Sequence, residues 1–213
     1  MSAGAREAQH ALGILGGTFD PVHYGHLVAA EEARHAFGLD SILFIPCGRP
    51  YHKPKPPTAS AEDRYEMTRL ATASNPLLDV SRIEIDRPGP SYTVDTVEAL
   101  KRERPGCGLY VILGTDAVEE LAEWAQPERL LEQCRLIVVS RPGAPWEEVE
   151  RALPPAYMEH VDRLEIPGLH ISSTELRRRA AEGRPLRYLV PDAVEAYIRE
   201  RGLYGAPGPG RDA

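Results

Sequence analysis

Two histidines, His23 and His26, are the residues of this chain whose types and position most clearly suggest a chemical function. They follow a glycine-rich segment, at the point where a helical pattern begins. An apolar run leads into Gly16 and Gly17, which predicts a strand and then a turn. A spacing of three residues sets both imidazoles on one face of the first helical turn. A strand, a glycine turn and a helix N-terminus together present backbone N–H groups to a phosphate. The segment therefore predicts an anion site with imidazole donors.

The alternative for this segment is an ordinary strand-to-helix turn with two solvated histidines. The full string, Gly-Gly-Thr-Phe-Asp-Pro-Val-His-Tyr-Gly-His, argues against that alternative, because it is far more specific than either histidine alone. Two other phosphate-binding loops are excluded. The glycines are not followed by the Gly-Lys-Ser/Thr of a P-loop, and the Gly-x-Gly-x-x-Gly of dinucleotide-binding dehydrogenases is absent.

A second cluster lies near the carboxyl end, where Ser172, Ser173 and Thr174 precede Glu175 and an apolar residue. This order is a helix N-cap signal, and it exposes hydroxyls and N–H groups at a positive helix end. Arg177 follows one turn later and could bind a phosphate bidentately. On its own, the cluster favours a capped surface helix with solvated arginines.

The composition sets limits on the class of protein. A chain of 213 residues with 42% hydrophobic and 27% charged residues is typical of a globular α/β domain. We expect one domain over residues 11–203, with disordered tails at 1–10 and 205–213. The formal net charge of −7 argues against a nucleic-acid partner, although a local basic block, Leu176–Arg179, leaves small anions possible.

Membrane and secreted classes are not expected. No apolar run approaches the ~20 residues of a membrane span, and the first residues lack the apolar core of a secretory signal. The three cysteines are far apart and fit neither a disulfide framework nor a zinc spacing; they are Cys47, Cys107 and Cys134. We expect a cytoplasmic protein with reduced thiols, and a homo-oligomer stays possible.

Strand-like and helical patterns alternate along the chain. The predicted strands cover residues 12–15, 42–45, 77–80 continuing to 83–85, 109–113, 136–140 and 163–166. The predicted helices cover residues 24–37, 61–73, 93–104, 115–121 with 127–132, 145–153, 173–182 and 191–201. Runs such as Leu136–Val139 are continuously apolar, as in strands covered on both faces. The pattern predicts an α/β fold with a doubly wound, mainly parallel sheet and a small C-terminal helical part.

The two clusters together resemble the nucleotidyltransferase superfamily, whose members carry His-x-Gly-His and Ile-Ser-Ser/Thr-x-x-x-Arg signatures. The segments between them narrow the resemblance to the bacterial nicotinate-nucleotide adenylyltransferases, over roughly residues 11–203. These segments are Phe44–Pro46, His52–Lys53, Val80–Glu84, Gly89–Thr96, Leu113–Asp116, Trp124 and Val138–Gly143. One departure is Tyr51, which stands where proline is expected before His52.

The resemblance implies a Rossmann-like fold and a reaction in which ATP and nicotinate mononucleotide give deamido-NAD and pyrophosphate. The attacking phosphate is already an anion at neutral pH, so no general base is required. Catalysis then consists of positioning and of stabilising charge on the transferred and leaving groups. Mg²⁺ would come with the ATP and bind phosphates and water, because no paired carboxylates lie near the motifs; Asp20 is interpreted as structural.

The resemblance also implies roles for particular residues. The predicted catalytic residues are His23, His26, Arg177 and Lys53. The predicted ATP-binding residues are Gly16, Gly17, Thr18, Phe19, His23, His26, Ile171, Ser172, Ser173, Thr174 and Arg177. The predicted residues for nicotinate mononucleotide are Lys53, Thr93, Asp116, Trp124 and Arg141. Three simpler interpretations stay open: a solvated Lys53, a packing Trp124, and an Arg141 that caps a strand end.

Other functions remain as alternatives. The acceptor could be nicotinamide mononucleotide or phosphopantetheine, although Tyr92–Thr96 and Trp124 favour a pyridine nucleotide. The first turn of the helix after Ser91 could receive the nicotinate carboxylate and so favour the acid over the amide. A non-catalytic nucleotide sensor should lack an imidazole or Arg177, and this chain has kept them.

Overall fold

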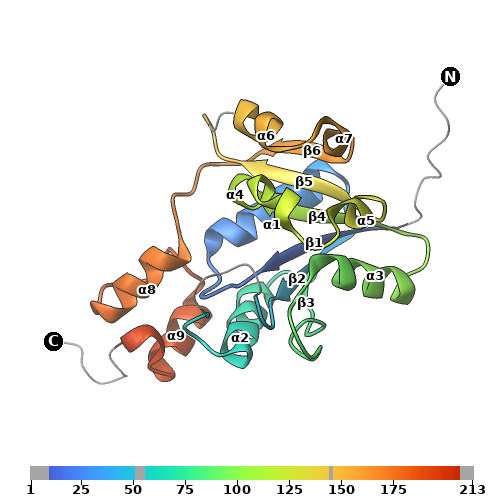
Figure 1. Ribbon diagram of the computed structural model, residues 1–213. Coiled ribbons are helices and arrows are strands. Elements are labelled where there is room, and N and C mark those ends of the chain that lie inside the picture. Colours follow the sequence, from blue (N-terminus) through green and yellow to red (C-terminus); the bar gives the residue numbers. More distant parts are fainter. Residues whose placement is uncertain (1–9, 51–55, 144–145, 207–213) are drawn as a thin grey trace.

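The computed structural model describes residues 10–50, 56–143 and 146–206, and these residues build a six-stranded, wholly parallel sheet (Figure 1). The strand order is β3-β2-β1-β4-β5-β6. The strands are β1 (His10–Gly17), β2 (Ser41–Pro46), β3 (Leu78–Val80), β4 (Cys107–Gly114), β5 (Arg135–Ser140) and β6 (Val161–Glu165).

Helices connect the strands and follow the last of them. The α-helices are α1 (Tyr24–Ala36), α2 (Ala61–Thr72), α3 (Thr93–Glu103), α4 (Thr115–Glu119), α5 (Pro127–Leu131), α6 (Trp146–Ala152), α7 (Pro155–Met158), α8 (Ser173–Ala181) and α9 (Asp192–Glu200). Two short 3₁₀ helices are η1 (Leu121–Glu123) and η2 (Leu203–Gly205). None of the helices in the described part of the chain is both long enough and apolar enough to cross a membrane.

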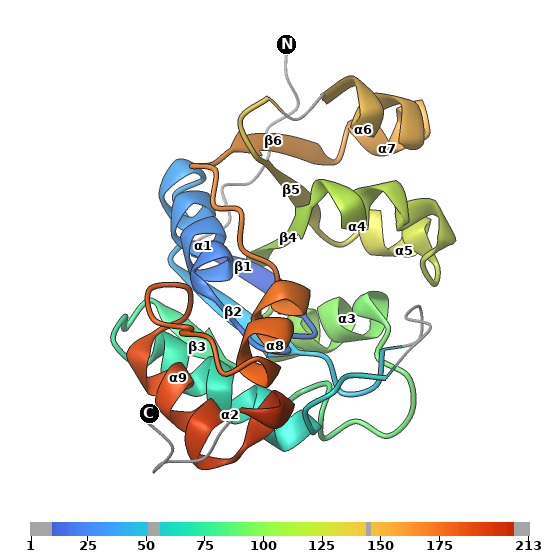
Figure 2. The ribbon, with the colours of Figure 1, turned by 90° about the vertical axis from the view of Figure 1, so that its left-hand side faces the viewer.

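Each face of the sheet has its own hydrophobic core. Successive side chains of a strand point to opposite faces, so Ile42 and Phe44 of β2 pack with α1, α2, α8 and α9. Leu43 and Ile45 pack on the other face with α3, α4, α5 and α6. Figure 2 shows α1, α2 and α9 on one side of the strands and α3, α4 and α5 on the other. The predicted doubly wound fold with a helical C-terminal part is therefore confirmed.

The chain reverses its direction of winding between β1 and β4. It adds β2 and β3 on one side of β1, then crosses back and adds β4, β5 and β6 on the other. In open parallel sheets, ligands bind at such a switch point, outside the carboxyl ends of the strands. Here those ends are Gly17 of β1 and Gly114 of β4.

Two local predictions are wrong. Gly16 and Gly17 do not form the turn after β1 but complete the strand, where Gly17 pairs with Pro46; the turn follows them. Residues 83–85 do not continue β3, because the chain turns there, with the N–H of Asp86 donating to the carbonyl of Arg82 at 2.9 Å. The sequence pattern also misses α7. The proposed single domain over residues 11–203 stays a prediction, and most of the two proposed tails lies outside the described residues.

One glycine shows how closely the loops pack behind the switch point. A Cβ on Gly48 would lie 2.2 Å from the carbonyl oxygen of Glu84. Only glycine therefore allows the chain after β2 to pass this close to the turn after β3. That contact fixes the path of the chain directly after β2.

Candidate active site

The two clusters predicted from the sequence meet at the end of the sheet where β1 ends. The hydroxyl of Ser173 donates to the carbonyl of Pro21 at 2.9 Å, across 152 residues of sequence. The guanidinium of Arg177 donates to the carbonyl of Asp20 at 2.7 Å, across 157 residues. Ser172 is the N-cap of α8, and its hydroxyl accepts the N–H of Glu175 at 3.2 Å. Two helix N-termini, those of α1 and α8, thus lie beside the same turn.

The two imidazoles form a stacked pair. Their ring centroids are 3.8 Å apart with an angle of 28° between the planes. The backbone N–H of His23, the N-cap residue of α1, donates to Nδ1 of His26 at 3.2 Å. Because Nδ1 of His26 accepts this bond, its proton lies on Nε2, which makes Nε2 the donor of that ring.

His23 is the more deeply buried of the pair, with 7% of its surface exposed. Burial, and to a smaller extent the positive charge of Arg141, lower its pKa from 6.5 to about 4. His23 is therefore neutral at pH 7. Its Nδ1 is buried and makes no hydrogen bond to the described residues.

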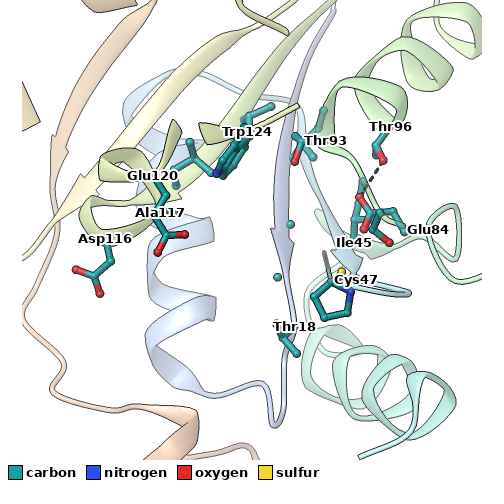
Figure 3. A pocket seen from close by; sticks show the side chains of 17 residues that line it. Thr18, Ile45, Cys47, Glu84, Thr93, Thr96, Asp116, Ala117, Glu120 and Trp124 are labelled. Carbon is teal, nitrogen blue, oxygen red and sulfur yellow. Dashed lines mark hydrogen bonds between the residues drawn. The ribbon is translucent and has the colours of Figure 1, made fainter. Parts of the chain in front are cut away.

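Three adjoining cavities surround these groups. The first, here called the switch cavity, has a volume of about 410 Å³ and lies between the ends of β1 and β4 and the start of α3 (Figure 3). The second, the α1 cavity, measures about 530 Å³ and lies against α1, β4, β5 and residues 166–173. The third, the α8 cavity, measures about 380 Å³ and lies between the turn after β1 and the start of α8.

Shared residues join the three cavities. Gly16, Asp116 and Ala117 line both the switch cavity and the α1 cavity. His26 and Ser173 line both the α1 cavity and the α8 cavity. A single elongated ligand could therefore run from one cavity to the next past the imidazoles.

The structure distributes the predicted ATP-binding residues over these cavities. Gly16, Gly17 and Thr18 line the switch cavity, and Thr18 also lines the α8 cavity together with Phe19, Thr174 and Arg177. Ile171, Ser172 and Ser173 line the α1 cavity with His23 and His26. The predicted set thus converges on one continuous region.

Four of the five residues predicted for the mononucleotide can be located. Thr93, Asp116 and Trp124 line the switch cavity. Arg141 does not line the switch cavity: it lies in the α1 cavity, which Asp116 also lines, with its Nη1 3.5 Å from Nδ1 of His170. Lys53 lies outside the described residues, as do Tyr51 and His52.

The switch cavity offers one aromatic wall and one helix start. Trp124 is half-buried, and its Nε1 is buried without a hydrogen-bond partner in the described part of the chain. Tyr92, the N-cap residue of α3, provides no side-chain cap for the first turn of that helix. Figure 3 shows Asp116, Ala117, Glu120 and Trp124 on one side of the cavity and Thr93, Thr96, Glu84 and Cys47 on the other.

Sequence analysis misses the buried acid of this cavity. Glu84 is 8% exposed, and its Oε1 accepts the hydroxyl of Thr96 at 2.8 Å. Burial raises the pKa of Glu84. Burial, together with the nearby charge of Glu84, also raises the pKa of the Cys47 thiol to about 11. The available signal is a charged residue inside an otherwise apolar run, but the pattern of that run predicts a strand.

Sequence analysis also misses the groups that hold the turn after β1. The Asp20 carboxylate accepts the N–H of Thr58 at 2.8 Å, the N–H of Ala59 at 3.1 Å and the hydroxyl of Tyr204 at 2.8 Å. Arg64, which is 1% exposed, donates to the carbonyl of Thr18 at 2.8 Å. These contacts agree with the interpretation of Asp20 as structural. They depend on pairings that local sequence patterns do not encode.

Comparisons with known proteins agree with this geometry. The model of the Cytidylyltransferase-like family matches residues 14–179. A relative named "Probable nicotinate-nucleotide adenylyltransferase" from Moorella thermoacetica is 51% identical over 197 residues, which is 91% of each chain. A relative with the same name from Thermus thermophilus is 49% identical over 193 residues, covering 91% of this chain and 98% of the relative.

A solved structure supports the fold. It is the Plasmodium falciparum nicotinic acid mononucleotide adenylyltransferase complexed with NaAD. The match has a TM-score of 0.76 at 20% identity and covers 92% of this chain and 98% of that one. The chain therefore belongs to the Cytidylyltransferase-like family and, within it, to the nicotinate-nucleotide adenylyltransferases.

Proposed function

We propose that this chain transfers the adenylyl group of ATP to nicotinate mononucleotide, giving nicotinate adenine dinucleotide and pyrophosphate, as a step of NAD biosynthesis. The names of the close relatives support this activity. The observation that carries it is the meeting of the two clusters. Through the bonds of Ser173 to Pro21 and Arg177 to Asp20, a guanidinium, the hydroxyl-rich start of α8 and a histidine pair face the same cavities.

In this proposal, ATP occupies the α1 cavity and the α8 cavity. The α1 cavity is lined by Val28, Ala29, Ile112 and Leu169, which suit the apolar faces of an adenine ring. The polyphosphate then passes His23 and His26 toward the start of α8. There Ser173, Thr174 and Arg177 would bind the β- and γ-phosphates. Arg141 lies on this ATP side, so we assign it to ATP in place of the mononucleotide.

Nicotinate mononucleotide would occupy the switch cavity. Its pyridine ring would stack on Trp124, and its carboxylate would accept N–H groups from the first turn of α3 at Thr93. Asp116 lines the switch cavity and the α1 cavity alike, so its carboxylate could accept a hydrogen bond from a substrate hydroxyl between the two substrates. A carboxylate is a far better acceptor for helix N–H groups than a neutral amide, so this arrangement favours the acid.

The chemistry follows from these positions. An oxygen of the mononucleotide phosphate attacks the α-phosphorus of ATP in line, and the bond to the bridging oxygen of the β-phosphate breaks. Negative charge grows on the transferred group and on the leaving pyrophosphate. The Nε2–H of His26 and the guanidinium of Arg177 stabilise that charge from fixed positions. Lys53, outside the described residues, remains a proposed further cation.

A divalent cation fits this site through the nucleotide rather than through a protein cage. Asp20, the nearest buried carboxylate, is already occupied by three hydrogen-bond donors. Nor do three or more histidine, cysteine or acidic side chains gather as ligands anywhere in the described ranges. We propose Mg²⁺, held by triphosphate oxygens and water, where it would neutralise charge on the leaving group. We propose the cytoplasm as the compartment, because the three cysteines are free thiols.

A pyrophosphate-release assay with ATP and separate acceptors tests this function. We expect turnover with nicotinate mononucleotide, a kcat/KM for nicotinamide mononucleotide that is roughly tenfold to a hundredfold lower, and none with phosphopantetheine. Equal rates for acid and amide would contradict the selectivity. ATP binding without release of pyrophosphate in the presence of any acceptor would instead support the nucleotide sensor.

A further inference from the structure

Tyr204 reaches the active site from the far end of the chain. It lies in η2, which follows α9 and contacts α8, the helix that carries Arg177. Its hydroxyl donates to Oδ1 of Asp20 at 2.8 Å, across 184 residues of sequence. Burial and the neighbouring Asp20 raise the pKa of Tyr204, so the phenol keeps its proton and acts as a donor at every pH at which the protein is assayed.

Asp20 connects Tyr204 to Arg177. Asp20 is almost fully buried, with 4% of the surface of the residue exposed. Its main-chain carbonyl accepts a hydrogen bond from Nη1 of Arg177 at 2.7 Å, whereas its Oδ2 lies 3.8 Å from the same nitrogen. The guanidinium is therefore hydrogen-bonded to the carbonyl, whereas its ion pair with the carboxylate is longer than a hydrogen bond.

The donors around Asp20 explain that separation. Oδ1 accepts the hydroxyl of Tyr204 and the N–H of Ala59, and Oδ2 accepts the N–H of Thr58. Because these three donors already stabilise its negative charge, the carboxylate attracts the Arg177 guanidinium less strongly. Arg177 therefore keeps N–H groups for a ligand. Removing one donor would strengthen the pull of the buried carboxylate on the nearby guanidinium, because a buried charge requires compensation.

We propose that Tyr204 is a positioning residue for the polyphosphate site: its bond to Asp20 keeps Arg177 directed into the α8 cavity. The side chain of Arg177 is 29% exposed and lines that cavity beside Thr174, whose hydroxyl accepts its Nη2 at 3.2 Å. The inference rests on the proposed function, in that the α8 cavity would hold the β- and γ-phosphates of ATP. Tyr204 itself touches no substrate in this arrangement.

The test compares the binding of ATP with that of AMP by titration calorimetry on the Tyr204→Phe variant. A misdirected Arg177 weakens only contacts to the outer phosphates. We therefore expect the Kd for ATP to rise on the order of tenfold and the Kd for AMP to stay within about twofold of the original value. An equal loss for both nucleotides, or no loss for either, would overturn the proposal.

Tyr197 provides a matched control. It lies in α9 of the same C-terminal part, and its hydroxyl also donates to a carboxylate, Oδ1 of Asp63, at 2.9 Å. Tyr197→Phe removes a comparable bond that has no connection to Arg177. We expect it to leave both nucleotide affinities unchanged. A selective loss of ATP binding in this control would mean that the C-terminal part acts only through general stability, and would contradict the proposal.

A double-mutant cycle separates positioning from a structural role. With Arg177→Ala in place, Tyr204→Phe should cause no further loss of ATP affinity, because the residue that it positions is gone. A full additional loss would contradict the proposal. Should Tyr204→Phe fail to fold, Asp20→Asn gives the opposite test: it removes the charge that would draw Arg177 away, so the affinity for ATP relative to AMP should stay near the original, and an ATP-selective loss would overturn the idea.

These binding measurements do not depend on the acceptor. A protein that binds ATP normally but transfers nothing to nicotinate mononucleotide would refute the proposed function and leave the role of Tyr204 open to the same ATP-against-AMP comparison. Normal turnover together with unchanged ATP affinity in Tyr204→Phe would refute the positioning role alone.

Discussion

The α8 cavity and the switch cavity are built in opposite ways. Hydrogen bonds between segments more than 150 residues apart join the walls of the α8 cavity: Ser173 to Pro21, and Arg177 to Asp20. The switch cavity takes much of its lining from one continuous stretch, Ser91–Trp124, and presents an aromatic ring whose N–H finds no partner among the described residues. Fixed donors suit a charge that must be stabilised in one place, whereas an aromatic wall suits the selection of a ring by shape.

This comparison predicts that changes at the two cavities affect different kinetic constants. Substitutions of residues that line the α8 cavity should lower kcat or the kcat/KM for ATP, because they remove stabilisation of the transition state. Substitutions in the switch cavity should raise the KM for the mononucleotide and leave ATP unaffected. The following predictions are ordered from the largest expected effect to the smallest.

The largest effect is expected for His26→Ala. It removes the Nε2–H that the proposed mechanism directs at the transferred group, and kcat should fall on the order of a hundredfold or more with the fold retained. His26→Gln restores an N–H near the position of Nε2 and should recover part of this loss. Steady-state kinetics provide the measurement, with circular dichroism to check folding. His35→Ala, at the exposed end of the same helix, is the control; near-normal turnover in His26→Ala would make His26 structural.

A smaller effect is expected for Arg177→Lys. Lysine keeps the positive charge but cannot bond Asp20, Thr174 and a phosphate from one planar group. The kcat/KM for ATP should fall roughly thirtyfold, or about 2 kcal/mol. Arg178→Lys is the matched control on the next residue, where the exposed guanidinium pairs with Glu175 and Glu182. Equal losses in both variants would show that only the net charge of α8 matters.

The next effect concerns stability and pH. His23 has a pKa of about 4 in the folded chain and 6.5 when unfolded. Between these values the unfolded chain binds more protons, so the free energy of unfolding falls as the pH falls. Between pH 6.5 and pH 5.5 the His23 contribution should be about 1 kcal/mol, and it should vanish above pH 7. Urea unfolding of the original chain and of His23→Gln measures the difference; identical pH slopes would exclude His23 as the cause.

The smallest effect is expected for Trp124→Phe. Phenylalanine keeps an aromatic face but loses the Nε1–H and part of the stacking area. The KM for nicotinate mononucleotide should rise about threefold to fivefold, with the KM for ATP unchanged. Trp146→Phe, in α6 where the ring lies beneath Arg163, is the control. A matching rise in the KM for ATP would break the division between the two cavities.

The sequence predicts the sheet and the two phosphate-facing clusters well. Buried parallel strands are continuous apolar runs, so strands such as β2 and β5 are found close to their observed ends. The clusters at His26 and Arg177 are recognisable because each combines a helix start with unusual side chains. That they meet was a prediction from the resemblance, and hydrogen bonds between them are observed. Their catalytic roles stay predictions.

Other parts could not be predicted from local patterns. The apolar residues at 83 and 85 imitate a strand, but between them lies Glu84, whose carboxylate turns inward to the switch cavity. Arg141 follows β5, and only the order of strands in space sets it beside the α1 cavity. The hydrogen bond from Tyr204 to Asp20 joins residues that are 184 positions apart, so no local spacing in the sequence predicts it.

Gly16, Asp116 and Ala117 line both the switch cavity and the α1 cavity, and this shared lining bears on the release of the product. Once the new phosphoanhydride bond forms, a single molecule occupies both cavities. The translational and rotational entropy of binding is then lost once for the product, instead of once for each of two separate ligands. Nicotinate adenine dinucleotide should therefore bind more tightly than either of its halves. We expect its departure, rather than bond formation, to limit the steady-state rate, and a stable two-headed mimic to be a stronger inhibitor than any single nucleotide.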